Sequence, residues 1–440
     1  MQKNITPRLI PALLAIAFSG GAHASGFALQ NQNGAGTGYA FAGSAAVAED
    51  ASTVWFNPAG MTYLPMGHSF SFAGSVIQRS LKYNEQATTP YLGALNTGNV
   101  PVGGSSEGGG ASLIPAMYWS YAISPALRVG LGISGPYGSE TEYSNNYAGR
   151  FAAYYTKIDT IDINPSIAYK FNDVISIGLG VNYTKTEVEL KSAAPVILPT
   201  GVRNPPVRLA GETTATVEGD DSAWGWNIGA MFQFTPATRV GVTYRSTLDN
   251  DLEGTLKAGP TSTGITAPLE QPDTFSLALS QKVGENLEIL ADATWTGWSS
   301  VKSLVGKTSA GREAVRLDFN YEDTWRFGLG GKYQLNPAWS LRTGIAYDQT
   351  PVPNDQARTL TVPDNDRFWL SFGARWQLNK PMSLDMGYAH IFMDDSRINR
   401  AVANPLPAAL NPTGAPAQTI NGNVETSINI FSAQLNYNWQ

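Results

Sequence analysis

The sequence contains no cysteine, only three histidines and, beyond its N-terminal region, no run of about 20 apolar residues. Without cysteine the chain can form no disulfide bond, no thiol redox pair and no cysteine-ligated metal site. Without a long apolar run it cannot cross a bilayer as a helix. Its formal charge at pH 7 is −6, and an acidic chain without basic clusters is not expected to bind nucleic acid.

The scarcity of histidine also argues against catalysis, because general acid–base chemistry needs an imidazole within reach of a nucleophile or water. His23 lies in a segment that we expect to be cleaved off, and His68 and His390 fall on the apolar face of their expected strands. No catalytic constellation remains. The sequence therefore predicts a protein that is not an enzyme and that uses no cofactor and no metal.

Residues 1–24 have the features of a secretory signal peptide. Lys3 and Arg8 supply positive charge, residues 10–18 form a short apolar core, and residues 22–24 read Ala-His-Ala, a small-residue cleavage site. That core is too short to span a bilayer of about 30 Å, which disfavours a membrane anchor. The mature chain should begin at Ser25, and losing Lys3 and Arg8 changes its formal charge from −6 to −8.

Period-two alternation of apolar and polar residues dominates the chain after Pro65 and predicts strands with two different faces. The stretches 127–134, 175–183 and 339–348 are good examples. We expect fourteen such strands, all antiparallel. In a soluble sandwich the apolar face would form the core, whereas in an outer-membrane barrel it would face lipid and the polar face would line the lumen. Alternation alone does not decide between these two folds.

Two further features favour a transmembrane barrel. Aromatic residues such as Trp224, Trp325 and Trp439 gather at strand ends, as expected for girdles at the two membrane interfaces. The expected connections also alternate between short turns and long loops, which is typical of outer-membrane barrels. The sequence thus predicts an all-β fold, a 14-stranded antiparallel β-barrel over residues 66–440, in the outer membrane.

Residues 25–65 lack the alternation and are rich in Gly, Ala, Ser and Asn. Eight strands enclose a lumen that side chains fill, whereas 16–18 leave a water channel. Fourteen strands leave a lumen that side chains alone cannot fill. We therefore expect residues 25–65 to form a plug inside the barrel.

Four stretches carry a resemblance to a known family over nearly all of the mature chain. They are 26–59, which ends in Asn57-Pro58-Ala59, then 132–151, 163–170 and 351–371. In this order they resemble the long-chain fatty-acid transporter family of the outer membrane (FadL-type), which includes aromatic-hydrocarbon uptake proteins. The resemblance implies a fourteen-stranded barrel with a plug, in agreement with the independent strand count.

The resemblance implies roles for two groups of residues. It places Phe27, Asn57, Pro58 and Ala59 in the hatch of the barrel, although Asn-Pro is also an ordinary helix stop and turn. It makes Gly135-Pro136-Tyr137-Gly138 an inward kink of the third strand that opens the wall sideways. The alternative is the plain outer end of a strand, because Pro and Gly interrupt a β-ladder.

The resemblance also implies a ligand route. The expected loops Lys191–Thr213 and Thr255–Pro272 would form the capture groove, and the first contains the apolar residues Val196, Ile197 and Leu198. Packing of this run against its own barrel mouth is the alternative. A carboxylate head group would need a cation beside an apolar pocket. The positions nearest to the family's basic residues are Lys191, Arg316 and, more weakly, Lys185.

Other basic residues on the lumen face, Arg326, Arg342 and Arg375, are expected to contact the plug or the wall instead. The sequence as a whole predicts passive uptake of hydrophobic compounds, long-chain fatty acids first, by a monomer surrounded by outer-membrane lipid and lipopolysaccharide. An aromatic-hydrocarbon transporter and a polar-solute porin with a constitutive plug are the alternatives. A porin would need a continuous wall at residues 135–143.

Overall fold

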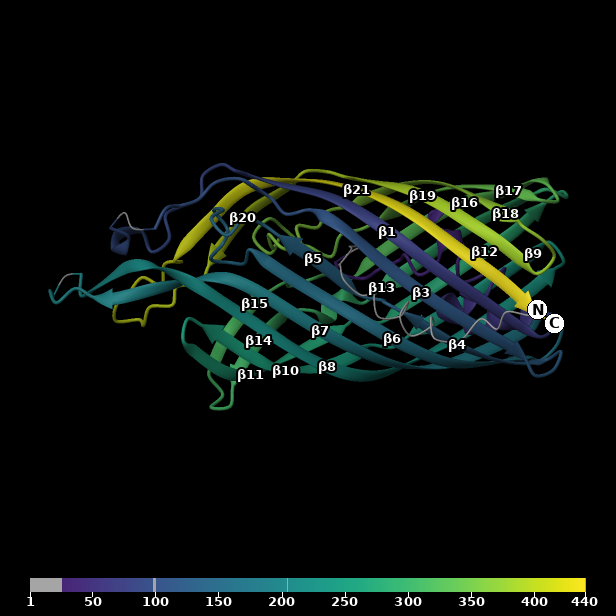
Figure 1. Ribbon diagram of the computed structural model, residues 1–440, viewed down its shortest axis with the longest axis horizontal. Helices are drawn as coiled ribbons and strands as arrows, with labels where there is room; N and C mark the ends of the chain where they lie inside the picture. The colour runs from purple at the N-terminus through teal and green to yellow at the C-terminus, as the bar shows by residue number, and fades with distance from the viewer. Residues whose placement is uncertain (1–25, 98–99, 204, 440) are drawn as a thin grey trace, which may run out of the picture.

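The protein is a closed antiparallel β-barrel, which confirms the predicted fold class (Figure 1). The computed structural model describes residues 26–97, 100–203 and 205–439. The first and last strands, β1 (His68–Glu85) and β21 (Gln418–Trp439), pair along their length and close the barrel. The predicted signal peptide lies outside the described residues, and within them no helix is long and apolar enough to cross a membrane.

Fourteen strands make up the barrel in the described part of the chain, eight of them continuous and six broken into two segments. The continuous strands are β1, β3 (Gly110–Ala122), β6 (Tyr155–Lys170), β7 (Ile175–Pro199), β8 (Val207–Thr235), β17 (Trp339–Asp348), β18 (Arg367–Gln377) and β21. The broken strands are β4 (Leu127–Ser134) with β5 (Gly138–Glu142), β9 (Thr238–Arg245) with β10 (Leu248–Ala258), β11 (Thr261–Gln271) with β12 (Thr274–Val283), β13 (Leu287–Thr296) with β14 (Ser303–Thr308), β15 (Glu313–Asp318) with β16 (Thr324–Asn336), and β19 (Met382–Met393) with β20 (Ser396–Val402). A two-residue strand, β2 (Ser106–Glu107), pairs with β1, and η2 (Gly93–Leu95) and η3 (Trp298–Ser300) are single 3₁₀ turns.

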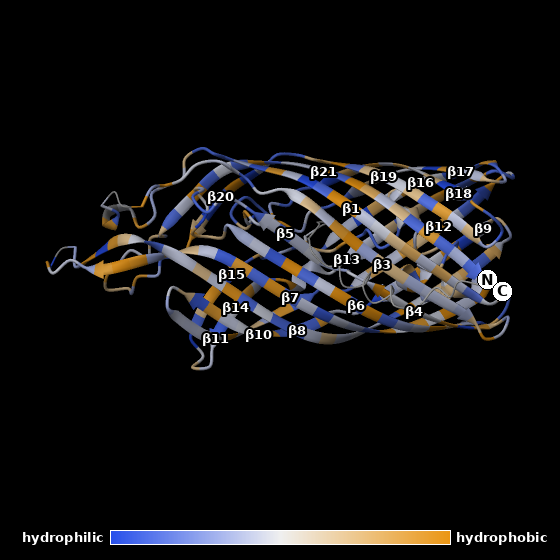
Figure 2. Cartoon of the chain, viewed as in Figure 1, coloured by the Kyte–Doolittle hydropathy of each residue, from blue (hydrophilic) through white to orange (hydrophobic). Residues whose placement is uncertain are grey.

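The two faces of each strand follow the sequence alternation. On β7 the side chains of Leu179 and Val181 are about half exposed on the outside, whereas Asn182 is buried on the inside. The same banding covers the part of the barrel next to the short turns (Figure 2). This pattern is stable only where lipid meets the outer face, because exposed apolar side chains gain nothing in water.

Two segments expected as loops are strands instead. β7 and β8 continue as one hairpin to Pro199 and Val207, far beyond the apolar band, and β10 and β11 occupy nearly all of Thr255–Pro272. The expectation of loops is wrong because strand pairing does not end where the apolar band ends. In an antiparallel hairpin each strand supplies the hydrogen-bond partners of the other, so the ladder continues into water.

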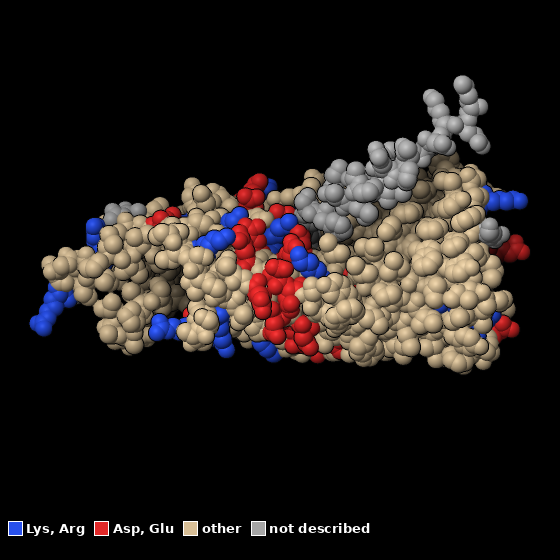
Figure 3. Space-filling model, turned by 60° about the horizontal axis from the view of Figure 1, so that its bottom comes forward, with Lys and Arg blue, Asp and Glu red and all other residues tan. Residues whose placement is uncertain are grey.

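Acidic side chains mark the outer limit of the apolar band on one side of the barrel (Figure 3). They lie on outward positions of neighbouring strands: Glu187 and Glu189 on β7, Glu218 and Asp220 on β8, and Asp251 and Glu253 on β10. Charges at this height cannot lie in hydrocarbon. The boundary between membrane and exterior therefore falls just before them, beyond the exposed ring of Trp224.

Residues 26–65 lie inside the barrel and are called here the N-terminal segment (Figure 1). The segment contains α2 (Gly34–Thr37), α3 (Thr53–Phe56) and η1 (Pro58–Tyr63). α2 packs on β18, β19 and β21, whereas η1 packs on the opposite wall at β6, β7 and β8. The segment therefore reaches across the lumen.

Glycines on the inner wall allow this close approach. A Cβ atom on Gly241 would lie 1.9 Å from the carbonyl oxygen of Ala45, and one on Gly229 would lie 2.0 Å from Oδ1 of Asn57. Both distances are far below van der Waals contact. The small residues of the N-terminal segment thus face wall positions that have no side chain.

We predict that Gly229→Ala destabilises the folded barrel by about 1–3 kcal/mol, because the added methyl overpacks the contact with Asn57. The matched control is Gly331→Ala on β16, where the nearest atom to a Cβ would be 3.8 Å away. The measurement is the urea midpoint of unfolding in detergent. Equal midpoints for the two variants would contradict the close approach.

Candidate functional site

The third barrel strand is interrupted where Gly135, Pro136 and Tyr137 separate β4 from β5. β3 pairs with β4 only from Met117 to Ala122, and β5 pairs with β6 but with no residue of β3. On this side the ladder between β3 and β4 ends at Met117 and Ile133. The barrel wall therefore has an opening at the interruption.

The N-terminal segment closes this opening. Ala28 forms an antiparallel bridge with Tyr137. The amide of Leu29 donates to the carbonyl of Pro136 at 2.7 Å, and the amide of Gly138 donates to the carbonyl of Phe27 at 2.9 Å. Residues 27–29 thus act as a short inserted strand in place of the missing part of the wall.

A cavity lies on each side of this inserted strand. The inner cavity, about 110 Å³, is lined by Phe41, Trp55, Arg245 and other residues of the lumen. The outer cavity, about 90 Å³, is lined by Leu113, Pro115, Ile161 and others on the lipid-facing side. Leu29 and Tyr137 line both cavities. A thin partition made by these two side chains and their backbone separates the lumen from the outside.

An apolar cluster fills the lumen on the extracellular side of the partition. Phe27 is fully buried at its base, with its ring centroid 4.9 Å from that of Trp298 and 5.8 Å from that of Tyr137. The amide of Gly26 donates to Asp364 at 3.0 Å. The remaining members of the cluster include Leu252, Leu269, Val301, Leu304, Phe319, Tyr321 and Val352.

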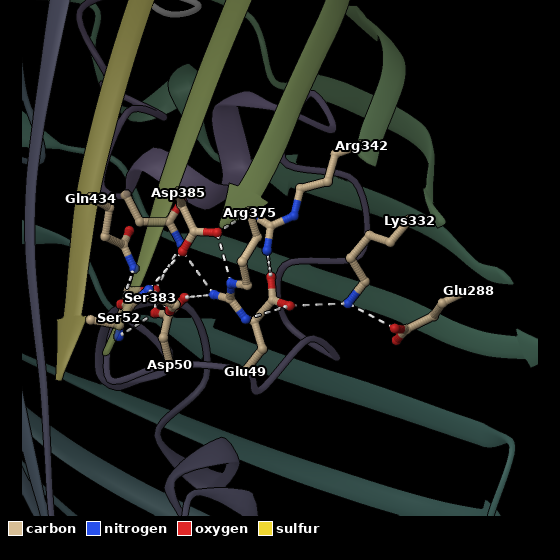
Figure 4. A network of polar contacts seen from close by, with 12 residues as sticks. Glu49, Asp50, Ser52, Glu288, Lys332, Arg342, Arg375, Ser383, Asp385 and Gln434 are labelled. Atoms are coloured by element: carbon tan, nitrogen blue, oxygen red, sulfur yellow. Dashed lines mark hydrogen bonds and ion pairs between the residues drawn. The ribbon is translucent and has the colours of Figure 1, made fainter. Parts of the chain in front are cut away.

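Polar contacts fix a later part of the N-terminal segment to the wall (Figure 4). Glu49 lies 3.0 Å from Arg342, 3.3 Å from Arg375 and 3.4 Å from Lys332. Both arginines also contact the buried Asp385, at 2.7 and 2.8 Å. The expectation that Arg342 and Arg375 contact the plug or wall is confirmed, and Arg326 likewise donates to the carbonyl of Ala40.

The charge state of Glu49 follows from these neighbours. Burial alone would raise its pKa, but Arg342, Arg375 and Lys332 together hold the pKa of Glu49 well below its usual value. A depressed pKa means that the carboxylate stabilises the folded state above its unfolded-state pKa of about 4.3, and that this contribution is lost as the pH falls below it. At neutral pH the contribution is fully present.

Asn57 is a second anchor of the N-terminal segment. Its amide nitrogen donates to the carbonyl of Ala45 at 2.8 Å and to that of Ala230 on the wall at 3.1 Å. Its Oδ1 accepts from the amide of Ala59 at 3.1 Å and so caps η1, which begins at Pro58. The Asn-Pro-Ala sequence is therefore both a turn and a tie between segment and barrel.

The three basic residues predicted for a head group lie away from the inner cavity. Lys191 is on an outward position of β7, 2.8 Å from Glu189. Lys185, also outward, lies 2.6 Å from Glu187 and lines the outer cavity. Arg316 on β15 is about half exposed and pairs with Glu313 at 2.7 Å and Asp318 at 3.0 Å. The structure does not bring these three together.

The apolar run at the end of β7 lies at the mouth of the barrel. Ile197 packs against a cluster that contains the buried residues Tyr91, Phe151 and Leu209, whereas Val196 and Leu198 are about 40% exposed. The rings of Tyr91 and Phe151 stack at 3.8 Å. This run therefore both packs against its own barrel mouth and presents apolar surface to the exterior.

Arg245 is a residue of the site that sequence reasoning missed. It lies 3.6 Å above the ring of Trp55, donates to the carbonyl of Trp55 at 3.0 Å and lines the inner cavity. The sequence does indicate its placement, because Arg245 is two residues after Thr243 and therefore lies on the same, lumen-facing side of β9.

Among the described residues there is no group of three or more potential metal ligands.

Comparison with known proteins places this barrel in a family. Residues 15–439 match the model of the outer membrane protein transport protein family OMPP1/FadL/TodX. The chain belongs to this family. The resemblance inferred from the four sequence stretches is therefore confirmed, as is the predicted location in the outer membrane.

Relatives of the OMPP1/FadL/TodX family align along most of the chain. A long-chain fatty acid transport protein of Salmonella typhi is 28% identical over 423 residues, covering 90% of this chain and 94% of its own. Outer membrane protein P1 of Haemophilus influenzae is 27% identical over 475 residues and covers both chains fully.

Solved structures share the fold of this chain. A FadL homologue of Pseudomonas aeruginosa has a TM-score of 0.83 at 25% identity, covering 94% of this chain and all of its own. The toluene transporter TbuX of Ralstonia pickettii has a TM-score of 0.66 at 18% identity, with coverage of 94% and 100%, and shares the fold.

We predict that Glu49→Gln lowers the stability of the folded protein by about 3 kcal/mol at neutral pH, because it leaves buried cations without their carboxylate. The control is Glu313→Gln, which breaks an exposed ion pair and should leave the urea midpoint nearly unchanged. Urea midpoints in detergent measure both effects. A Glu49 variant as stable as the control would show that the network does not anchor the segment.

Proposed function

We propose that this outer-membrane protein carries hydrophobic compounds passively into the membrane through the opening in its wall, with long-chain fatty acids as the first candidates. The observation that carries the proposal is the pair of cavities that share Leu29 and Tyr137 as lining residues. A small displacement of residues 27–29 would join them into a path from the lumen to the lipid. No energy source is required, because an apolar ligand gains free energy on leaving water for lipid.

The first step of the proposed route is capture at the extracellular end. Val196, Leu198 and the packed Ile197 offer apolar surface beside Tyr91 and Phe151, where an amphiphile could be held. From there the ligand would enter the apolar cluster above Phe27. Long-chain fatty acid transport is the activity named for relatives such as that of Salmonella typhi.

The second step is the movement of the hatch, the N-terminal segment that includes Phe27, Asn57, Pro58 and Ala59. In this proposal Asn57 and the Glu49 network stay fixed, and only the residues before α2 shift. Gly135, Pro136, Tyr137 and Gly138 then frame the lateral gap. Gly26, whose amide donates to Asp364 at 3.0 Å, would shift with Phe27.

Two alternatives differ in what they need from the structure. An aromatic-hydrocarbon transporter could use the same path, since two of the fold neighbours are toluene transporters. A polar-solute porin would need a lumen open along its axis and a continuous wall. The interruption between β4 and β5 and the buried N-terminal segment favour lateral exit over the porin.

A disulfide across the partition tests the lateral exit. Ala28 and Tyr137 are bridge partners, so their Cα atoms lie about 4.5–5.5 Å apart, within the range of a disulfide. The native chain has no cysteine to compete. We predict that oxidised Ala28→Cys/Tyr137→Cys protein loses fatty-acid uptake in cells and regains it when the disulfide is reduced.

The matched control is a second cross-link within the part of the segment that should not move. Oγ1 of Thr37 lies 2.8 Å from Oγ of Ser432 on β21, so Thr37→Cys/Ser432→Cys should form a disulfide and leave uptake unchanged. Undiminished uptake by the oxidised Ala28–Tyr137 pair would overturn the lateral exit. Loss of uptake in the control pair would mean that the whole segment moves.

A further inference from the structure

Three polar side chains form a row on the lipid-facing side of the barrel wall. His390 on β19 pairs with Asn429 on β21, and Asn429 pairs with Gln78 on β1, so the three residues lie directly opposite one another on neighbouring strands (Figure 1). All three point outward, because their chain neighbours Ile391 and Ile430 are fully buried on the inner face. Side chains on directly opposite residues are close enough to interact. The row therefore forms one continuous polar surface.

The surface around the row is apolar. Two residues nearer the short turns, Val76 and Phe431 are 42% and 51% exposed. The ring centroid of Phe392 lies 4.3 Å from that of His390 on the other side. Polar side chains that face lipid are costly and therefore rare, and where they occur they usually have a function. A row of three such residues calls for a polar partner on the outside of the barrel.

The row lies at the outer edge of the membrane. Counted from the end of the barrel that carries the short turns, His390 is the ninth residue of β19, and Asn429 and Gln78 are each the eleventh residue of their strands. A strand needs about 9–11 residues to cross the hydrocarbon core, and the short turns of such barrels face the periplasm. The three side chains therefore reach the head groups of the external leaflet.

Hydrogen bonds within the row determine which groups it offers to a ligand. Oδ1 of Asn429 accepts from the hydroxyl of Tyr388 at 2.9 Å and lies 2.9 Å from Nδ1 of His390. An amide oxygen can only accept, so Nδ1 of His390 carries the proton, and Nε2 of the neutral ring is left as an acceptor. Within the described part of the chain, Nδ2 of Asn429 and the side-chain amide of Gln78 have no protein partner. The row thus presents amide donors next to an imidazole acceptor.

We propose that this row binds lipid A, the membrane anchor of lipopolysaccharide, through the amide-linked hydroxyacyl chains of its head. Lipopolysaccharide occupies the external leaflet of an outer membrane. At this depth lipid A carries amide carbonyls, which accept from Asn429 and Gln78, and hydroxyl groups, which donate to Nε2 of His390. The acyl chains would lie on Val76 and Phe431.

Phospholipids match the row less well. At the same depth they carry ester groups, which accept hydrogen bonds but donate none, so the imidazole acceptor would remain without a partner. The inference goes beyond the proposed function and does not depend on it, because the row faces lipid and not the lumen.

The test measures lipid binding to the purified full chain folded in detergent. The probes are lipid A and phosphatidylethanolamine, and native mass spectrometry gives the apparent dissociation constant of each. We expect the wild type to bind one lipid A in preference to phosphatidylethanolamine. The double variant Asn429→Val/Gln78→Val should bind lipid A about 10-fold more weakly, the effect of losing two hydrogen bonds. Valine suits a lipid-facing strand position, so the barrel should fold normally.

Thr343→Val is the matched control. Thr343 on β17 is also a polar residue on the outer face, but it lies outside the row, and its hydroxyl already donates to the carbonyl of Ser371 at 3.0 Å. Its replacement should leave both affinities unchanged. His390→Phe is a second, independent variant, which keeps an aromatic ring beside Phe392 but removes the acceptor and should also weaken lipid A binding.

Each other outcome overturns the proposal. Equal lipid A affinity in the wild type and in Asn429→Val/Gln78→Val would show that the row is not the site, and so would a wild type that binds no lipid A. An equal loss for lipid A and phosphatidylethanolamine would mean that the row accepts any lipid head group. The same loss in Thr343→Val would assign the effect to the general polarity of the wall. None of these results bears on the proposed transport.

Discussion

The structure depends on how backbone hydrogen bonds are satisfied where the third barrel strand is interrupted. In a membrane every backbone polar group must find an internal partner, so an open edge in the wall is costly. Here Pro136 and Gly138 find their partners in residues 27–29 of the N-terminal segment rather than in a neighbouring strand. The wall and the segment therefore form one hydrogen-bonded unit, and the segment can move only if these bonds are replaced.

The N-terminal segment is held unevenly along its length. Its middle part is fixed by the ionic contacts of Glu49, by Asn57 and by wall glycines that admit its backbone. The residues before α2 are held by a few hydrogen bonds, such as that from Gln32 to the carbonyl of Gly135 at 2.8 Å, and by aromatic packing of Phe27 on Trp298. Such an arrangement allows the first residues to shift while the rest still fills the lumen.

The two-residue alternation of the strands could be read from the sequence, whereas contacts between distant segments could not. Alternation predicted the strand count and the outward apolar face, and the lumen parity of Arg342 and Arg375 predicted their contacts with the N-terminal segment. The same parity from Leu179 to Lys191 places both Lys185 and Lys191 on the outer face of β7. The long β7–β8 hairpin and the contact of Arg245 with Trp55 depend on pairing between distant segments, which no local pattern contains.

The polarity of the two cavities indicates how an opening at this place can be tolerated. Moving residues 27–29 would break the backbone hydrogen bonds from Leu29 to Pro136 and from Gly138 to Phe27, and it would also separate the carbonyl of Leu29 from the side-chain amide of Gln32. Ser44, Thr243, Ser276 and Thr294 line the inner cavity, and such hydroxyl groups can hold waters that bridge exposed backbone groups. The outer cavity is lined by Leu113, Pro115 and Ile161 together with the charged side chains of Asp159, Lys185 and Glu187. Both cavities therefore combine apolar surface with polar groups, so each can contact a hydrocarbon chain and also hold the waters that exposed backbone groups need.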